Sequence, residues 1–351
     1  MLKFNPLQDK HPKGAVSSSQ DILFEVWVHQ DFYFKQISLV LLNDFTHEKT
    51  SYTFEPTNIL SAQSRKYIVT IPPLETGLYF YDFEITFDDS IGYLKKHKFD
   101  AVFTMEEQSY ASWQLTVYDA DFQTPEWMKG SIMYQIFPDR FKKSPQYTAT
   151  VAANEDVRVR HEHWNEIPYS SITHENYRAQ DFFMGNLKGI QEELPYFQQL
   201  RIDNIYLNPV VESPENHRYS TSDYFNVDPY LGTVQDFKDL CSEFKEKDIR
   251  ITLDGVFSHT GADSIYFNRY GHYDSLGAYQ SQDSPYYPWF TFIEFPNVYQ
   301  SWWGFTNLPT VVKENKEYSD FINNKDTGVV NFWQKLGIAG WRLDVADEFP
   351  D

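Results

Sequence analysis

The order of hydrophobic and polar residues changes once along the chain, and this change divides the chain into two parts. Up to about residue 122, every second side chain is apolar in runs such as residues 22–29 and 79–87. Gly77 and residues 88–92 carry turn-forming residues beside these runs. A period of two places the apolar side chains on one face of a strand. Residues 1–122 are therefore predicted to form an all-β sandwich.

Beyond residue 122 the apolar residues form short continuous runs, separated by segments with helical spacing. The runs that predict strands are residues 131–137, 202–208, 248–254 and 337–345, and the segments that predict helices are residues 186–200, 233–247 and 326–335. Pro195 is expected to break the first helix, and Thr233 is expected to cap the second. Alternating strands and helices are typical of a parallel sheet.

We therefore predict that residues 123–351 form part of a (β/α)8 barrel, an α/β fold. Such a barrel needs eight strands and typically ~250 residues, whereas only four strands can be recognised here. The expectation is that this chain is the N-terminal part of a longer protein.

The last predicted strand carries the first candidate for catalysis. Arg342 and Asp344 are two residues apart, so they share a strand face with roughly 6–7 Å between their Cα atoms. A nearby guanidinium stabilises the charged form of a carboxylate. An ionised carboxylate within reach of a substrate is what a glycosidase nucleophile requires. The alternative is a structural ion pair at a strand end.

Two other predicted strand ends also carry polar residues. Asp254 ends the third strand and is followed closely by His259, while residues 216–224 form a polar loop after the second strand. Taken alone, each could be an ordinary turn or loop. In parallel barrels, however, functional residues cluster at the C-terminal ends of strands. Three polar strand ends in one chain favour one shared functional site over three unrelated turns or loops.

Composition narrows the classes of partner. A formal net charge of −20 repels phosphate groups, so we expect neither a nucleic acid nor an anionic membrane as a partner. No run approaches the ~18 apolar residues of a membrane helix, and the N-terminus lacks the apolar core of a signal peptide. The only cysteine, Cys241, allows no intrachain disulfide. We therefore expect a cytoplasmic location.

Together these segments resemble the α-amylase family, glycoside hydrolase family 13. Residues 340–348, Gly-Trp-Arg-Leu-Asp-Val-Ala-Asp-Glu, are similar to the segment with the catalytic nucleophile in neopullulanases and cyclomaltodextrinases. Residues 254–259 resemble the motif Asp-x-x-x-Asn-His of the third strand. Residues 217–224, His-Arg-Tyr-Ser-Thr-Ser-Asp-Tyr, are similar to His-x-Tyr-Asp-Thr-x-Asp-Tyr. Residues 133–141 look like the first barrel strand.

The resemblance implies a retaining hydrolase of α-glucosidic bonds that acts on maltooligosaccharides, cyclodextrins or pullulan. Asp344 would be the nucleophile, and Arg342 would orient it. His259 and Asp254 would line the sugar site, and Tyr219 would stack on the same sugar. His217 and Asp223 would help to shape the pocket. The N-terminal sandwich would match the domain that precedes the barrel in neopullulanases, through which a homodimer is expected.

The resemblance also implies a small domain inserted after the third strand, at residues 261–316. Two aromatic segments fall in this insert, residues 286–290 and 302–305. Packing is the expected role of most of these rings, and stacking on glucose that of one or two.

Two departures from the family pattern limit these expectations. Ser258 stands where many members have an asparagine that binds calcium, and the polar residues 142–180 lack the spacing of a calcium site. We therefore do not assume a calcium ion, and no cofactor is assigned from the sequence. A retaining mechanism also needs a second carboxyl group roughly 5 Å from the nucleophile. The family's glutamate for that role follows the fifth strand, so this chain is expected to be inactive alone. A glycosyltransferase of the same family and a non-catalytic carbohydrate-binding fragment are the alternatives.

Overall fold

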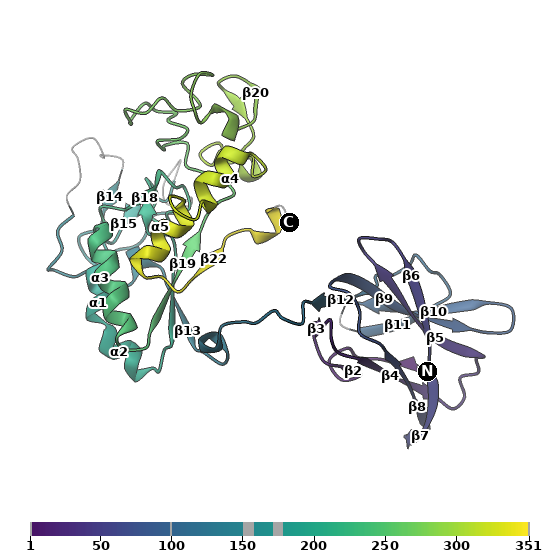
Figure 1. Cartoon of the computed structure of the whole chain (residues 1–351). Helices are drawn as coiled ribbons and strands as arrows, with labels where there is room; N and C mark the ends of the chain where they lie inside the picture. The colour runs from purple at the N-terminus through teal and green to yellow at the C-terminus, as the bar shows by residue number, and fades with distance from the viewer. Residues whose placement is uncertain (1, 99, 150–157, 171–177, 350–351) are drawn as a thin grey trace. The chain divides into compact units, whose positions relative to one another are not determined.

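The computed structural model describes residues 2–98, 100–149, 158–170 and 178–349. It contains two units, Met1–Glu126 and Trp127–Asp351, so the division lies close to the predicted boundary after residue 122. Figure 1 shows strands in the first unit and both helices and strands in the second.

The first unit consists of two largely antiparallel sheets. One sheet contains β1 (Leu2–Lys3), β2 (Lys10–His11), β4 (Ile22–His29), β7 (Glu55–Ser61) and β8 (Ser64–Ile71). The other contains β3 (Val16–Ser17), β5 (Gln36–Asn43), β6 (Lys49–Thr53), β9 (Gly77–Thr86), β10 (Ile91–His97), β11 (Asp100–Thr104) and β12 (Trp113–Tyr118). The alternating side chains of β4 and β9 face one shared core, as their period of two predicts.

Aromatic rings fill much of this core. Phe24, Tyr81 and Phe83 are almost fully buried, and Trp113 stacks on Tyr81 with 5.7 Å between ring centroids. Trp27 is half-buried beneath the ammonium group of Lys66, which lies 5.0 Å from the ring centroid. Trp113 therefore stabilises the sandwich and is not available to a ligand.

The second unit is built on a parallel four-stranded sheet. Its strands follow one another in chain order: β13 (Met133–Ile136), β16 (Asn204–Leu207), β19 (Arg250–Gly255) and β22 (Gly340–Leu343). Both inner strands are buried, as continuous apolar runs predict. The first strand, β13, is less buried than its apolar run indicates, because it lies at the edge of this sheet, and Met133 is 44% exposed.

Helices pack along this sheet, and Figure 1 shows α1, α2 and α3 side by side. The helices are α1 (Leu187–Glu192), α2 (Leu194–Gln199), α3 (Val234–Lys245), α4 (Lys316–Asn323) and α5 (Val329–Leu336). The first predicted helix breaks before Pro195, which lies in the first turn of α2. Thr233 caps α3 in a reciprocal box with Asp236, as predicted.

Two helix predictions differ from the structure. The last helix begins at Val329 and not at residue 326, because the Asn324 side chain accepts hydrogen bonds from the backbone of Asp326 and Thr327 and holds them in a turn. Helix α4 was not predicted. Gly337 ends α5 with a left-handed backbone (φ 112°), which glycine adopts without strain.

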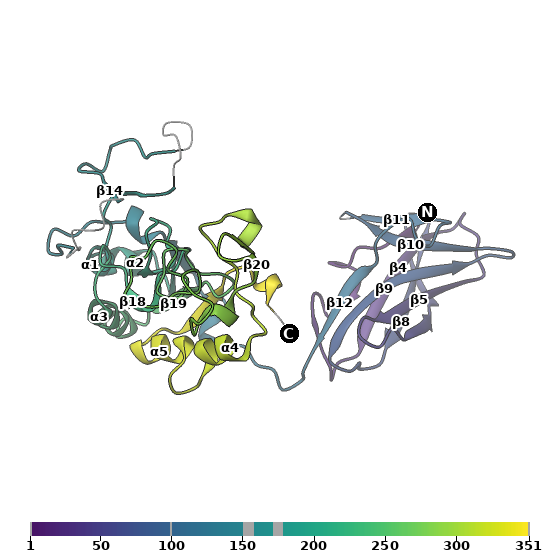
Figure 2. The ribbon, with the colours of Figure 1, turned by 90° about the horizontal axis from the view of Figure 1, so that it is seen from above.

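Short elements complete the unit, and Figure 2 shows the insert around β20 from above. They are β14 (Val159–Arg160), β15 (Asp181–Phe182), β17 (Val211–Glu212), β18 (Asp223–Val227), β20 (Phe292–Glu294), β21 (Val298–Tyr299) and the 3-10 turns η1 (Glu126–Met128), η2 (Pro138–Arg140), η3 (Tyr287–Trp289), η4 (Trp302–Gly304) and η5 (Ala346–Glu348). The polar residues 142–180 lie partly outside the described residues.

The first residue of the insert, Gly261, packs against the loop that follows β16. The backbone nitrogen of Gly261 donates to the Thr221 carbonyl oxygen at 2.8 Å. A β-carbon at Gly261 would lie 2.9 Å from the Ser220 carbonyl oxygen, closer than real Cβ contacts come. Only glycine fits at this contact.

No helix among the described residues is long and apolar enough to cross a membrane. The homodimer and the cytoplasmic location stay predictions.

Candidate active site

Parallel register brings the polar strand ends together. In the pairing of β19 with β22, Asp254 lies directly opposite Arg342. Asp344 follows β22 by one residue, and its backbone nitrogen donates to the Gly255 carbonyl oxygen at 3.0 Å. Three candidate residues therefore lie at one edge of the sheet, because parallel strands end on the same side.

Arg342 connects two carboxylates. Its Nη1 donates to Asp344 Oδ1 at 2.5 Å and to Asp254 Oδ1 at 3.1 Å. Partial burial alone would lower the pKa of Arg342, but the charges and hydrogen bonds of Asp254 and Asp344 raise it. The guanidinium therefore keeps its positive charge and fixes the Asp344 side chain in place.

Asp254 is the buried partner in this arrangement. Its carboxylate accepts hydrogen bonds from the hydroxyl groups of Tyr206 and Tyr219, the latter at 2.9 Å. Burial raises the pKa of Asp254, although these hydrogen bonds and Arg342 oppose the shift. Burial and the Asp254 charge raise the pKa of Tyr219 to about 12. The Tyr219 hydroxyl also accepts from Asn208 Nδ2 at 2.9 Å, so its orientation is fixed from two sides.

His259 presents one unused nitrogen. The ring is buried, and its Nδ1 lies 2.9 Å from Ser258 Oγ, whereas Nε2 has no hydrogen-bond partner in the part of the chain that the structure describes. Burial lowers the pKa of His259 to about 4, although the nearby Asp344 charge opposes the shift. A buried polar nitrogen without a partner suits a ligand hydroxyl.

His217 lies beside Tyr219 and is held by its neighbours. Its Nδ1 accepts from the Tyr219 backbone nitrogen at 3.1 Å, and its Nε2 lies 3.2 Å from Glu215 Oε2. Burial alone would raise the pKa of Glu215, but hydrogen bonds from His217, Ser220 and Asn307 outweigh it and lower that pKa. Glu215 therefore carries a negative charge that positions His217.

These side chains line one cavity of about 890 Å³. Its walls include the predicted residues His217, Tyr219, His259 and Asp344. The insert contributes Tyr270, Trp302, Phe305 and Asn307 to the lining, and Arg178 lines it as well. A cavity of this size, with apolar rings and a few convergent polar groups, suits a small organic ligand.

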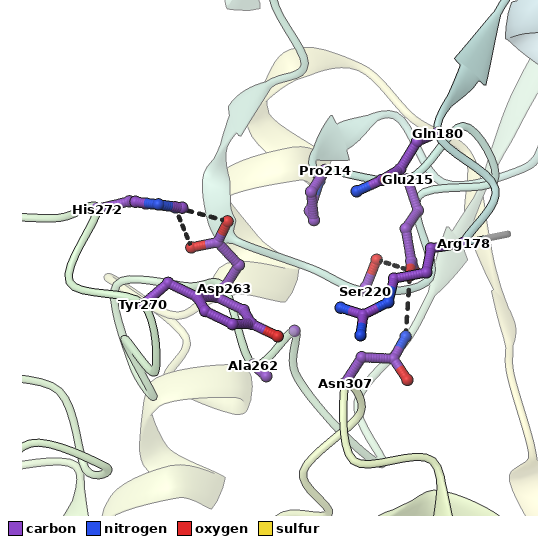
Figure 3. Close-up of a pocket in the computed structure, with 11 residues that line it drawn as sticks. Arg178, Gln180, Pro214, Glu215, Ser220, Ala262, Asp263, Tyr270, His272 and Asn307 are labelled. Carbon is purple, nitrogen blue, oxygen red and sulfur yellow. Dashed lines mark hydrogen bonds and ion pairs between the residues drawn. The ribbon is translucent and has the colours of Figure 1, made fainter. Parts of the chain in front are cut away.

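A smaller cavity of about 160 Å³ adjoins the first, and both are lined by Arg178, Glu215, Tyr270 and Asn307. Figure 3 shows the Glu215 carboxylate between two partners. Ser220 Oγ donates to it at 2.5 Å, and Asn307 Nδ2 donates at 2.9 Å. Ser220 stands at the position where the family motif His-x-Tyr-Asp-Thr-x-Asp-Tyr has its first aspartate. Glu215 therefore supplies a carboxylate beside Ser220 and ties the insert to the loop after β16.

Asp223, like Asp254 and Arg342, does not line the large cavity. It begins β18, where its carboxylate accepts from the Phe225 backbone nitrogen at 2.9 Å and from Asn226 Nδ2 at 2.6 Å. Its place in the fold is that of a turn-stabilising residue, and a role in shaping the pocket stays a prediction.

No metal centre is visible in the described ranges of the chain, which contain no group of three or more His, Cys, Asp or Glu residues able to hold an ion. The Ser258 hydroxyl, at the position where calcium-binding members have asparagine, bonds to His259 instead. Ser258 thus helps to orient the imidazole.

The profile of the family described as "Alpha amylase, catalytic domain" matches residues 135–351, more than half of the chain. The chain belongs to the α-amylase family. Its relatives in this family include an amylopullulanase of Thermoanaerobacterium thermosulfurigenes, 43% identical over 263 residues, which cover 67% of this chain and 14% of the relative. An intracellular maltogenic amylase of Bacillus subtilis is 34% identical over 237 residues, or 66% of this chain and 36% of the relative.

Solved structures share the fold of this α-amylase family member. The type III pullulan hydrolase from Thermococcus kodakarensis matches with a TM-score of 0.59 at 23% identity, over 100% of this chain and 57% of that one. A cyclomaltodextrinase matches with a TM-score of 0.55 at 21% identity, over 94% and 53% of the two chains. The chain thus spans little more than half of these structures and much less of the curated relatives.

Several site residues of this family member were not foreseen from its sequence. They are Tyr206, Asn208, Glu215 and Asn307, together with Arg178 and Tyr270 in the cavity lining. Tyr206 and Asn208 lie in and directly after β16, so the strand-end argument could have found them. Glu215 and Asn307 are 92 residues apart in the sequence, and no local pattern connects them.

Proposed function

We propose that this protein is a retaining glycoside hydrolase that cleaves α-glucosidic bonds of α-glucans, with Asp344 as the nucleophile. The observation that carries the proposal is the Asp344 carboxylate in the wall of a cavity of about 890 Å³, held 2.5 Å from the Arg342 guanidinium. Maltooligosaccharides, cyclodextrins and pullulan are the proposed substrates, and the relatives named for amylase and pullulanase activities support this class.

In the proposed mechanism, an Asp344 oxygen attacks the anomeric carbon while the bond to the leaving oxygen breaks. A covalent glycosyl-enzyme forms, and water then attacks the same carbon and releases Asp344. Arg342 orients the nucleophile, and His259, which lines the cavity, is assigned to binding the sugar. The Tyr219 ring supplies an apolar surface for the face of the sugar in the cavity.

The leaving oxygen needs a proton from a second carboxyl group. Asp254 already accepts hydrogen bonds from two tyrosines and Arg342, and Glu215 is held by Ser220 and Asn307. Both are therefore assigned to positioning, and the proton donor is assigned to neither. A test of the nucleophile should use a leaving group that needs no proton.

α-Maltosyl fluoride provides that test, because fluoride leaves without protonation. The protein is incubated with it and quenched in acid, and its peptides are weighed by mass spectrometry. We expect one added maltosyl group on the peptide with Asp344. Asp344→Asn should remove the label and slow fluoride release by about 1,000-fold or more.

Asp347→Asn is the matched control, since Asp347 is an exposed carboxylate in the next turn. It should label like the wild type. A label on another residue, or labelling that survives in Asp344→Asn, defeats the nucleophile assignment. Binding of maltooligosaccharides without any label would favour a carbohydrate-binding protein instead.

A further inference from the structure

Arg218 stands between two residues that line the large cavity, but its own side chain is completely buried. His217 and Tyr219 are part of the cavity lining, whereas the exposed fraction of Arg218 is 0%. The backbone at Arg218 is left-handed (φ 61°), which is uncommon for residues other than glycine. Strained backbone of this kind persists only where surrounding contacts hold it, and it clusters at functional sites.

The Arg218 guanidinium supplies such contacts on the buried side of the turn. Its Nη1 donates to the Asn216 carbonyl oxygen at 2.8 Å, and its Nε lies 3.3 Å from Asp228 Oδ2. Asp228 directly follows β18 and is itself 0% exposed. One side chain therefore holds both an oxygen of its own turn and a carboxylate of the core. The turn cannot move away from the core without breaking a buried ion pair.

Asn216 holds the same turn at a second point, because its Nδ2 donates to the Asp181 carbonyl oxygen at 2.8 Å. Residues 216 and 218 thus bind the core, whereas residues 217 and 219 line the cavity. The two rings are set against each other by this turn. The Tyr219 nitrogen donates to His217 Nδ1 at 3.1 Å, and their ring centroids lie 5.8 Å apart.

We propose that Arg218 is a positioning residue, whose buried guanidinium holds the turn that directs His217 and Tyr219 toward the bound glucan. This inference rests on the proposed function, since it takes the cavity to be a glucan site. The planar guanidinium can bind the carbonyl oxygen and the carboxylate at once, whereas the ammonium group of lysine is a single point charge. Arginine and lysine are therefore not equivalent at this position.

The test measures the dissociation constant of maltotriose by titration calorimetry in the Asp344→Asn background, where turnover is blocked. Arg218→Gly removes the guanidinium and still accepts the left-handed backbone. Asp228 keeps the Arg158 guanidinium at 3.2 Å, so no unpaired carboxylate is created there. We expect the dissociation constant to rise by about tenfold in Arg218→Gly and by about threefold in Arg218→Lys, because the turn is less fixed before binding.

Arg158→Lys is the matched control. Arg158 is also buried and pairs with the same carboxylate, but it lies outside the turn that presents the two rings. This substitution should leave the dissociation constant unchanged. If Arg218→Gly does not fold, as judged by circular dichroism, the two lysine variants decide the question, and equal dissociation constants in Arg218→Lys and Arg158→Lys overturn the proposal.

A double-mutant cycle gives a result that a merely structural role would not produce. When His217→Ala and Tyr219→Ala are already present, Arg218→Gly should change the dissociation constant by less than about twofold, because no ring is left to position. An effect of the same size with and without the two rings overturns the positioning role. Wild-type affinity in folded Arg218→Gly overturns it as well.

The two proposals fail separately. Maltotriose binding without maltosyl labelling of Asp344 defeats the nucleophile assignment and leaves the role of Arg218 to be decided by the dissociation constants. Intact labelling with unchanged affinity in Arg218→Gly defeats only the positioning role. If the Asp344→Asn protein binds no maltotriose, the glucan site and the role of Arg218 in it are both wrong.

Discussion

Each unit of this protein holds a carboxylate that is mostly shielded from solvent beside a cation, but the two pairs occupy different places in their sheets. In the sandwich, Lys95 Nζ donates to Asp82 Oδ2 at 2.7 Å, and Ser112 Oγ donates to the same oxygen at 2.9 Å. Asp82 and Lys95 lie within the neighbouring strands β9 and β10, and Ser112 directly precedes β12. In the second unit, Asp254 meets Arg342 where two parallel strands end.

The comparison teaches that position in the sheet, and not the ion pair itself, gives the second pair its chemical use. Lys95 donates a hydrogen bond to the carboxylate of Asp82, whereas Arg342 binds both Asp254 and Asp344, and Asp344 lines a cavity. A pair within a strand can only stabilise its sheet. A pair at the end of parallel strands can also hold a reactive group toward a ligand.

The largest expected effect separates these two roles directly. Asp254→Ala leaves Arg342 and two tyrosine hydroxyls without a buried acceptor, so it should lower the free energy of unfolding by about 4 kcal/mol. Fluoride release from α-maltosyl fluoride should fall by about 100-fold or more, because Asp344 loses its fixed neighbour. Urea titration and fluoride release measure the two effects.

The matched substitution in the sandwich is Asp82→Ala. It should cost about 2 kcal/mol of unfolding free energy, since Lys95 is left without its carboxylate, but labelling of Asp344 should persist in the folded protein. If both substitutions reduce labelling equally, the distinction between the two pairs is wrong.

A pH titration sharpens the comparison through the buried imidazole of His259. The pKa of His259 falls from 6.5 to about 4 on folding, so between these values the unfolded chain binds a proton that the native protein does not. Stability should therefore decrease as the pH falls from 6.5 to 4, by about 3 kcal/mol. Urea midpoints measured from pH 7 to 4 test this.

His259→Gln should remove this part of the pH dependence. The matched control is His29→Gln, which removes a partly exposed histidine from β4 of the sandwich and leaves the buried imidazole in place. An unchanged slope in His259→Gln would show that His259 titrates normally and that its ring is hydrated.

The smallest expected effect concerns Glu215, which positions His217 and Asn307. Glu215→Gln keeps the shape but loses the charge, so charge-assisted hydrogen bonds become neutral ones. We expect the KM for α-maltosyl fluoride to rise by about tenfold, with a smaller change in kcat. Because the pKa of Glu215 is lowered, its stabilising effect is present above the usual 4.5 and is lost as the pH falls through the native value.

The readout that a merely structural role would not produce is the pH profile of KM, which should change only when the charge beside His217 is removed. Glu25→Gln, which breaks the 2.8 Å contact of Glu25 with Lys66 in the sandwich, is the control. If wild type and Glu215→Gln have the same KM and the same pH profile, the proposal that Glu215 positions His217 is wrong.

Local chemistry made much of this fold predictable. The capping box at Thr233, the break before Pro195 and the end of α5 at Gly337 all depend on neighbours in the sequence. The contact of Arg342 with Asp344 is also local, because alternate residues of a strand share a face.

Other features depend on register and on distant partners, which the sequence does not specify locally. Asp254 meets Arg342 only because β19 and β22 pair in one register, which no single strand specifies. The exposed side of β13 depends on its place at the sheet edge. The Asp223 carboxylate accepts hydrogen bonds from Phe225 and Asn226, and its role in shaping the pocket stays a prediction. Tertiary context decides such cases.

The close contact at Gly261 has a consequence for how such a protein can diversify. Since no side chain fits against the Ser220 carbonyl oxygen, the root of the insert is fixed while the aromatic loop beyond it remains open to replacement. Natural or engineered exchange of that loop could retune which glucans are accepted without disturbing the reactive acid. Different recognition loops could then follow the same attachment point at Gly261.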